Sequence, residues 1–297
     1  MGGRRSSIWA AAALWAALGG GARADDDDNK PKSGDPYYRL DTKNLFGALE
    51  GADVGEAGDR SVELETTAGL FKRMGRYAFI EQEVIYEFTP TPRLGIEIGA
   101  HAFGQAIHGA VGNYSGVDLS GLSNEWRYVL VPRGGAWSTQ LTGTLTPQVA
   151  RVFEGGARGL DYALPVLFIL DMQPIERRLY AALNVSYAPE IAVPLGDQVS
   201  RLSTLNASGA LSWRLTPDAM LGIEGDALNA FDGLAAQSWR GSAFFLGPTF
   251  HYQFNDKVDL SGGWTQQIAG RARGDGGALD LTNFSRSQAK LRLEIDF

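Results

Sequence analysis

Alternating polarity is the feature of this chain that most restricts its fold. In the last eight residues, KLRLEIDF, apolar side chains at 291, 293, 295 and 297 alternate with charged ones at 290, 292, 294 and 296. A period of two predicts a β-strand with one apolar and one charged face. Similar segments of about ten residues, separated by turn-forming residues, recur from Ser61 onward and predict about 12 strands in all.

The connections between these segments fall into two groups. The short links, after every second segment, read TPTPR, VPRGG, QPIERR, LTPD and QFNDK. Apart from KRMGR after the first segment, the others are longer and lie near residues 107–118, 153–160, 190–200, 229–238 and 269–283. This arrangement predicts an all-β transmembrane antiparallel barrel over residues 60–297, with short periplasmic turns and longer extracellular loops. The strand count changes by two if residues 44–54 form a strand or if the sixth segment, YALPVLFIL, is misread.

Aromatic residues favour this barrel over a soluble β-sandwich or a lipocalin-like barrel. They gather near the predicted strand ends, as rings do at a membrane–water interface. The group near the short turns is Tyr86, Phe88, Tyr128, Trp137, Tyr180, Trp213, Tyr252, Phe254 and Phe297; the group near the other end is Phe71, Tyr77, Tyr162, Tyr187 and Trp239. The polar faces also carry more charge than a soluble core tolerates.

The N-terminus has the pattern of a secretory signal peptide, predicted at residues 1–24. Two arginines precede the apolar stretch IWAAAALWAALGG, and the small-residue site ARA ends the segment. That stretch is short for a membrane anchor, the alternative reading. Residues 25–59 are predicted to be a flexible segment. Its later part, NLFGALEGADVG (44–55), is more apolar and either stays in the periplasm or partly plugs the barrel; the sequence does not choose.

Charge and cysteine content exclude other classes of protein. Three of the 27 Lys and Arg lie in the signal peptide, so its removal shifts the net charge from −7 to about −10 against 34 Asp and Glu. An acidic chain without a basic tract argues against nucleic-acid binding. The chain has no Cys, so no disulfide contributes to its stability. No apolar run after residue 24 is long enough for a transmembrane helix.

Three stretches resemble an uncharacterised family of proteobacterial outer-membrane proteins that is porin- or transporter-like. They are LFGALEGADVGEAGDRSVELETT, FLGPTFHYQFNDKVDLSGGWTQQIAGRA and LDLTNFSRSQAKLRLEIDF. The last strand, ending on Phe297, also resembles the assembly signal of bacterial outer-membrane barrels. The resemblance implies a location in the bacterial outer membrane, contact with its lipid, and recognition by the barrel assembly machinery. It brings no catalytic motif; we expect a monomer.

In such a barrel the charged faces line the interior. The predicted inner residues are Glu63, Glu65, Glu81, Glu83, Glu97, His101, Glu125, Arg127, Glu224, Asp226, His251, Asp259, Lys290 and Arg292. They form either an acidic, cation-favouring channel wall or a network of ion pairs that fills a narrow barrel. The last strand must lie antiparallel to the first, which brings Lys290 and Arg292 toward Glu63 and Glu65.

Signals for catalysis and metal binding are weak. If Phe88 lies opposite Leu94, then Glu81 falls opposite His101. The carboxylate then either favours the charged form of the His and makes it pH-sensitive, or forms a plain structural hydrogen bond with it, which is the favoured interpretation. An outer-membrane lipase or esterase needs a Ser activated by a His, yet there is no GxSxG and only three His, with His108 predicted in a loop. We expect no enzyme activity, metal or cofactor. The sequence favours a passive channel for small or hydrophobic solutes; the alternative is a plugged structural or surface-interaction barrel.

Overall fold

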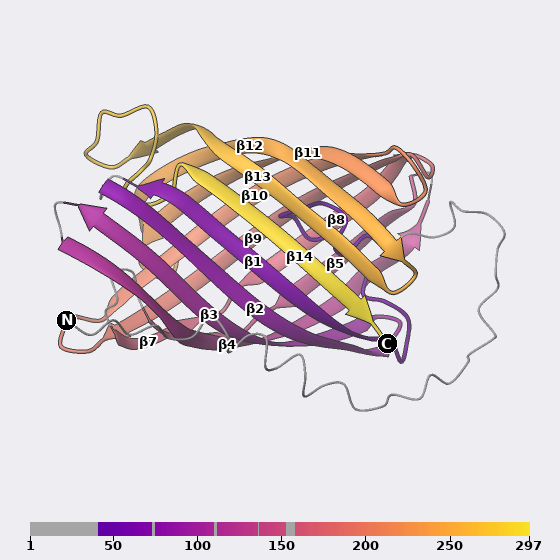
Figure 1. The fold of residues 1–297 in the computed structure, drawn as a ribbon, viewed down its shortest axis with the longest axis horizontal. Helices are drawn as coiled ribbons and strands as arrows, with labels where there is room; N and C mark the ends of the chain where they lie inside the picture. Colours follow the sequence, from indigo (N-terminus) through magenta and orange to yellow (C-terminus); the bar gives the residue numbers. More distant parts are fainter. Residues whose placement is uncertain (1–40, 73–74, 110–111, 136, 153–157) are drawn as a thin grey trace, which may run out of the picture. The chain divides into compact units, whose positions relative to one another are not determined.

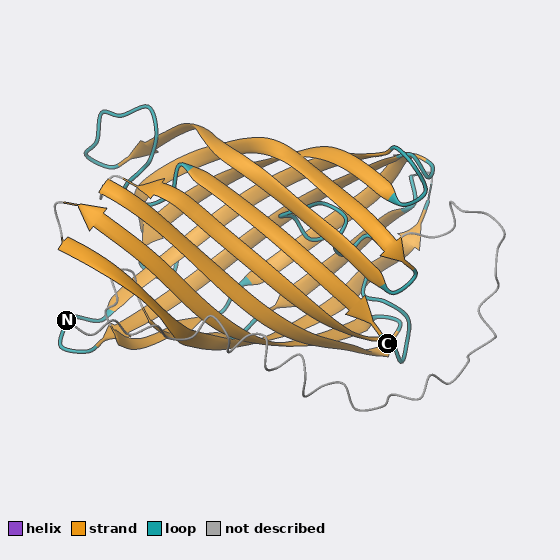
Figure 2. Cartoon of the chain, in the orientation of Figure 1, coloured by secondary structure: helices purple, strands orange, loops and turns teal. Residues whose placement is uncertain are grey.

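The computed structural model describes residues 41–72, 75–109, 112–135, 137–152 and 158–297. The predicted signal peptide and residues 25–40 lie outside the described residues. Figures 1 and 2 show a single antiparallel sheet that curves into a closed barrel. Its strands are β1 (Arg60–Lys72), β2 (Gly75–Thr91), β3 (Leu94–Gly109), β4 (Gly112–Gly134), β5 (Thr139–Leu145), β6 (Gln148–Val152), β7 (Arg158–Ala163), β8 (Val166–Ile175), β9 (Leu179–Pro194), β10 (Ser200–Arg214), β11 (Ala219–Asp232), β12 (Ser238–Asn255), β13 (Val258–Ala272) and β14 (Ser287–Asp296).

Among the described residues, no helix has the length and hydropathy needed to cross a membrane.

Two of the barrel's strands are each broken in the middle, so 14 labelled strands make a 12-strand barrel. β5 and β6 continue one another across Pro147, and both pair with β4. β7 and β8 do the same across Pro165, and both pair with β9. A proline has no N–H to donate to the ladder, which explains the break. The carbonyls of both prolines still accept backbone hydrogen bonds, from Asn124 and Thr146, so the wall remains continuous.

The ring closes between the first and last strands, as the sequence predicted. β14 lies antiparallel to β1 with Arg292 opposite Glu65. Lys290 Nζ lies 2.7 Å from a Glu65 carboxylate oxygen, and Arg292 Nε lies 3.0 Å from the same carboxylate. The predicted seam pairing is therefore confirmed. Opposite charges across two strands stabilise the pairing by a few tenths to about 1 kcal/mol each.

The outer face of the barrel is apolar. On β12, exposed Leu246, Phe250 and Tyr252 alternate with buried Thr249 and His251. Comparable exposed side chains surround the barrel, for example Leu122, Leu221, Trp264 and Leu291. An apolar belt of this extent is stable against lipid and not against water.

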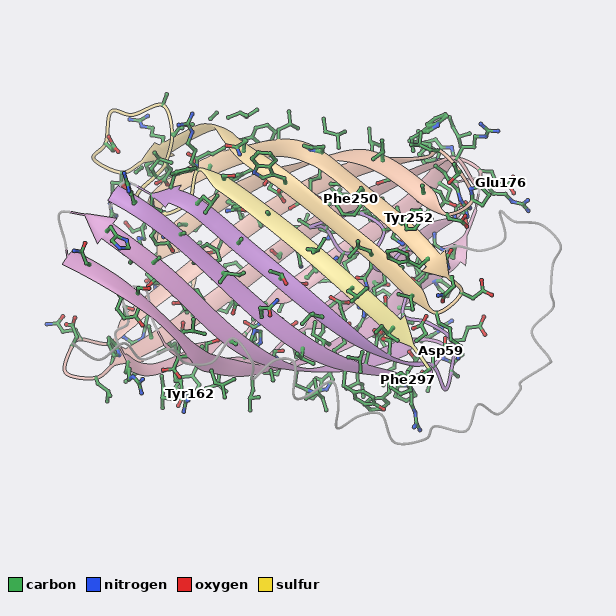
Figure 3. The ribbon with its side chains drawn as sticks, viewed as in Figure 1. Asp59, Tyr162, Glu176, Phe250, Tyr252 and Phe297 are labelled. Carbon is green, nitrogen blue, oxygen red and sulfur yellow. The ribbon has the colours of Figure 1, made fainter. Side chains whose placement is uncertain are left out.

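The connections at the two ends of the barrel differ in length, although less than predicted. Glu176, in the turn after β8, lies at the same end as Asp59 and Phe297 (Figure 3). The links at this end are short, as expected. At the other end, three of the predicted long loops, near 107–118, 190–200 and 229–238, are wrong. β3 extends to residue 109 and β4 begins at 112, while only 195–199 separate β9 from β10 and only 233–237 separate β11 from β12. His108 therefore belongs to β3 and not to a loop. The long connection is 273–286.

The predicted aromatic groups are largely, but not wholly, at the surface. At the short-turn end, the Phe297 ring lies 6.5 Å from that of Tyr86. Tyr180 is an exception, because it is 2% exposed and points inward. Tyr77 is buried as well. The residues inside the barrel that Tyr180 contacts belong to the N-terminal segment described next.

Candidate functional site

Residues 41–55, called the inner segment below, lie inside the ring of strands. Leu45, Phe46 and Leu49 are 1%, 0% and 3% exposed. They form one apolar cluster with inward-pointing side chains of three neighbouring strands. These wall residues are Tyr180 and Ala182 on β9, Ala210 on β10 and Met220 on β11. Burial of apolar side chains from both sides stabilises the docked segment.

The inner segment is a compact loop that closes on itself. Leu45 N–H donates to the Thr42 carbonyl, and Gly51 N–H donates to the Lys43 carbonyl over 2.8 Å. A Cβ at Gly51 would lie 1.8 Å from the Thr42 carbonyl oxygen. Gly47 has a φ of +68°, where a side chain is strained, and its Cα faces the Gly262 carbonyl of β13. Glycine at these two positions permits the tight fold and the close approach to the wall.

Near the start of the segment, Lys43 is held by wall carboxylates. Its Nζ lies 3.0 Å from Glu97 Oε1 and also contacts Glu87. Burial alone lowers the pKa of Lys43, but the negative charges of Glu87 and Glu97 outweigh burial and raise the pKa well above its usual value. The amide of Asn44 donates to Glu63 over 2.9 Å and to Glu294 over 2.6 Å. This side of the inner segment is therefore bound to β1, β2, β3 and β14.

Near the middle of the segment, the Glu50 carboxylate meets three cations. Arg127 Nη2 on β4 lies 3.0 Å from Glu50, Arg292 on β14 contacts it, and Lys290 Nζ lies 3.7 Å away. The same guanidinium groups donate to backbone carbonyls, Arg127 to Gly51 and Arg292 to Leu49. Burial alone raises the pKa of Glu50, but the three cations hold the pKa well below its usual range. Charge-assisted, multidentate contacts of this kind are among the strongest in proteins.

A third cluster holds the end of the segment. Arg133 on β4 lies 2.9 Å from Asp53 of the segment and 3.0 Å from Asp171 on β8. Asp171 also accepts a hydrogen bond from the Ala52 N–H over 2.9 Å. The Ala52 carbonyl accepts from two wall side chains, Gln140 and Thr142. Each described polar contact between segment and wall thus involves at least one side chain.

None of the predicted inner residues is exposed. Those in direct contact with the inner segment are Glu63, Glu97, Arg127, Glu224, Lys290 and Arg292. Those grouped with other wall residues are Glu65 with Lys290, Glu125 with Arg127, Glu81 and Glu83 with His101, and His251 with Asp259; Asp226 lies opposite Ser208. That they line a path for solutes stays a prediction.

The predicted register around His101 is wrong by two residues. Phe88 lies opposite Ile96, and Glu83, not Glu81, lies opposite His101, because β2 continues to Thr91 through an irregular pairing. Both carboxylates still reach the ring: Glu83 lies 3.1 Å from Nε2 and Glu81 lies 3.4 Å from Nδ1. Ser123 donates to Glu83 over 2.6 Å. Glu83 therefore lies between Ser123 and His101, whereas in a nucleophilic triad the His lies between the Ser and the carboxylate.

A polar cavity of about 210 Å³ lies beside the inner segment. Its lining combines Lys43 and Glu50 with wall residues of β1 to β4, β6 and β14, including Glu65, Glu83 and Lys290. The volume can hold several water molecules. Among the described residues, no group of three or more His, Asp or Glu is arranged to hold a metal ion.

Sequence reasoning missed the residues that fasten the inner segment. Lys43, Glu50 and Asp53 have no periodic pattern around them, and Arg133 lies at the end of its strand. One signal was present: Asp171 interrupts the apolar run VLFILDM. A lone carboxylate in such a run indicates an internal partner, because unpaired charge is costly there.

Comparisons with known proteins agree with this fold. A model of a family of unknown function, DUF6662, matches residues 39–297. No curated protein matches the chain. The COG4313 outer membrane channel from Pseudomonas putida F1 is similar with a TM-score of 0.56 and 13% identity, over 83% of this chain and 98% of that one. The KdgM porin in complex with disordered oligogalacturonate aligns with a TM-score of 0.46 and 6% identity, over 80% and 99%.

The COG4313 likeness concerns the fold, since identity is low. The chain has the fold of outer-membrane β-barrels, and its apolar outer belt lies against lipid in the bacterial outer membrane. The sequence prediction of fold class and location is thereby confirmed.

Proposed function

The chain belongs to the DUF6662 family, and on this basis we propose that it is a monomeric outer-membrane channel for small solutes, obstructed by its own inner segment. One observation carries the proposal. The inner segment is attached through side chains, whereas the barrel strands are joined by backbone ladders. The segment can therefore leave its position without breaking a strand pairing, and the barrel stays intact.

The charge of the wall supports a preference for cations in the open channel. Acidic side chains outnumber basic ones among the predicted inner residues. Fixed negative charge in a water-filled pore raises the local concentration of cations. With the inner segment displaced, Lys43 and Glu50 leave together, so the wall keeps its acidic excess.

Single-channel conductance in planar bilayers tests the proposal. The full-length mature protein is compared with a variant that lacks residues 25–55. We expect small or rare currents from the first and larger, steady, cation-selective currents from the second. A folded variant that conducts no current would contradict the channel function.

A structural role without transport is the second candidate. Arg127 and Arg292 are each 1% exposed and bound to both segment and wall, so the segment also ties distant strands together. Under this alternative, removal of residues 25–55 lowers the unfolding temperature of the barrel and produces no current.

The proposal includes no catalytic role. Phospholipid hydrolysis by the refolded protein in detergent is the direct measurement, with His101→Ala as its comparison. Activity that depends on this His would support an outer-membrane lipase or esterase instead.

A further inference from the structure

We propose that the wall surface beneath the inner segment is also a ligand site, and that its ligands are amphipathic carboxylates with an apolar body and one carboxylate group. This proposal rests on the proposed channel function, because the ligand is a solute that takes the place of the inner segment. The segment itself shows what the surface recognises.

The first part of the site is a carboxylate cradle. Arg127 on β4 and Arg292 on β14 both contact the Glu50 carboxylate, and Lys290 lies 3.7 Å from it. β4 and β14 are not neighbours in the sheet, so these side chains converge across the interior. Two guanidinium groups on one carboxylate select this group by geometry as well as by charge.

The second part is an apolar patch on the opposite side of the segment. Tyr180, Ala182, Ala210 and Met220 point into the barrel and contact Leu45, Phe46 and Leu49. The interior faces of pore-forming barrels are polar, since water fills them. An apolar patch left bare by the segment would be hydrated at a cost in free energy, so an apolar solute gains by covering it.

Consecutive residues of the segment reach the two parts of the site. Leu49 belongs to the apolar cluster, and Glu50 carries the bound carboxylate. Arg292 joins them, since it donates to the Leu49 carbonyl over 3.1 Å and contacts the Glu50 carboxylate. A molecule with a ring or alkyl chain a few carbons from its carboxylate therefore spans both surfaces.

The site is compatible with an acidic wall. Wall carboxylates also pair with the two guanidinium groups, Glu125 with Arg127 over 3.3 Å and Glu65 with Arg292 over 3.0 Å. Arg127 Nη1 and both Nη atoms of Arg292 bind the segment instead, so these donors are available to a ligand carboxylate once the segment leaves. The inner segment competes with any ligand as a tethered carboxylate, with an effective concentration of about millimolar or higher. Wild-type protein should therefore bind weakly, and loss of the Glu50 charge should strengthen binding.

Binding of 4-phenylbutyrate to the full-length mature protein in detergent, measured by isothermal titration calorimetry, tests the proposal. We expect Glu50→Gln to bind it at least about tenfold more tightly than wild type, because the tethered competitor is weakened. In the Glu50→Gln background, Arg127→Gln should abolish the gain, and Met220→Gln should reduce it. The uncharged 4-phenylbutanol, which is matched in size, should bind more weakly than 4-phenylbutyrate to Glu50→Gln.

Heat-modifiable mobility on gels verifies that each variant is a folded barrel; Lys290→Gln replaces Arg127→Gln if the latter does not fold. Equal binding of acid and alcohol, or no gain in Glu50→Gln, would overturn the ligand proposal. Conductance of the variant lacking residues 25–55 is measured separately. Current without ligand discrimination overturns the ligand site alone, and a silent barrel that binds 4-phenylbutyrate overturns the channel while supporting the site.

Discussion

Replacement of Phe46 by Ala isolates the contribution of the apolar contact to docking of the inner segment. Phe46 is 0% exposed and lies among Tyr180, Met220 and the other members of the apolar cluster. Truncation of a buried Phe to Ala costs about 3–5 kcal/mol in protein cores. Because Phe46 belongs to the segment and not to the wall, this loss falls on the docked state. At about 3 kcal/mol the ratio of displaced to docked segment rises about 150-fold.

Single-channel recording measures this ratio as the time spent in the larger conductance divided by the time spent in the smaller one. While the larger conductance is rare, this ratio equals the open fraction. We expect Phe46→Ala to increase that fraction by about two orders of magnitude, with no change in the unfolding temperature of the barrel beyond a few degrees. Phe250→Ala is the matched control, because Phe250 is 36% exposed on the lipid side of β12 (Figure 3). It should leave the open fraction unchanged.

A folded Phe46→Ala barrel with wild-type currents would refute the reasoning, since the apolar contact would then contribute nothing to docking. An equal increase in Phe250→Ala would refute it as well, because the effect would then arise from the barrel wall.

The remaining predictions concern the loop, pH and assembly. Gly51→Ala should open the channel as Phe46→Ala does, in the same recordings, because its Cβ would lie 1.8 Å from a carbonyl oxygen of the segment. The Glu50 charge stabilises docking fully above pH 4.5, the usual pKa of this group, and its contribution is lost as pH falls through the lowered pKa of the docked state. The Lys43 charge stabilises docking fully below pH 10.5, and its contribution is lost as pH rises through the raised pKa of the docked state. Between pH 5.5 and 9.5, roughly one unit inside those limits, Glu50 therefore keeps its charge, and Glu50→Gln should change the level of conductance but not its dependence on pH. Different pH profiles of wild type and Glu50→Gln in this range would contradict the assignment. Deletion of Phe297 should lower the folded fraction of the barrel in cell envelopes more than it lowers the folded fraction after refolding in detergent. Heat-modifiable mobility measures both fractions.

Features that repeat locally could be predicted well from the sequence. The period of two assigned the strands, and it placed charged side chains on the inner face and leucines on the outer face. The pairing of Lys290 and Arg292 with Glu65 followed from closure of the barrel, because the last strand has only the first to pair with. These inferences depend on alternation within one strand or on the ring as a whole.

Features that depend on strand register or on strand ends were predicted less well. Glu81 was placed opposite His101, whereas an irregularity between Phe88 and Thr91 puts Glu83 there. The loop near 107–118 was overestimated, because Gly- and Ser-rich stretches read as loops although the strands extend through them. β2 continues through TPT to Thr91, where these residues suggested a turn, and a bulge within that stretch leaves no clear mark in composition.

The sequence by itself determined the barrel, its outer belt and its place in the membrane, because alternation is a property of neighbouring residues and lipid selects the apolar face. Only the tertiary structure decided what lies inside. Glu50 meets Arg127 and Arg292 across separations of 77 and 242 residues, and such contacts have no period to read. The inner segment has no alternation of its own, so its position follows from the charges and the apolar patch that the closed ring brings together.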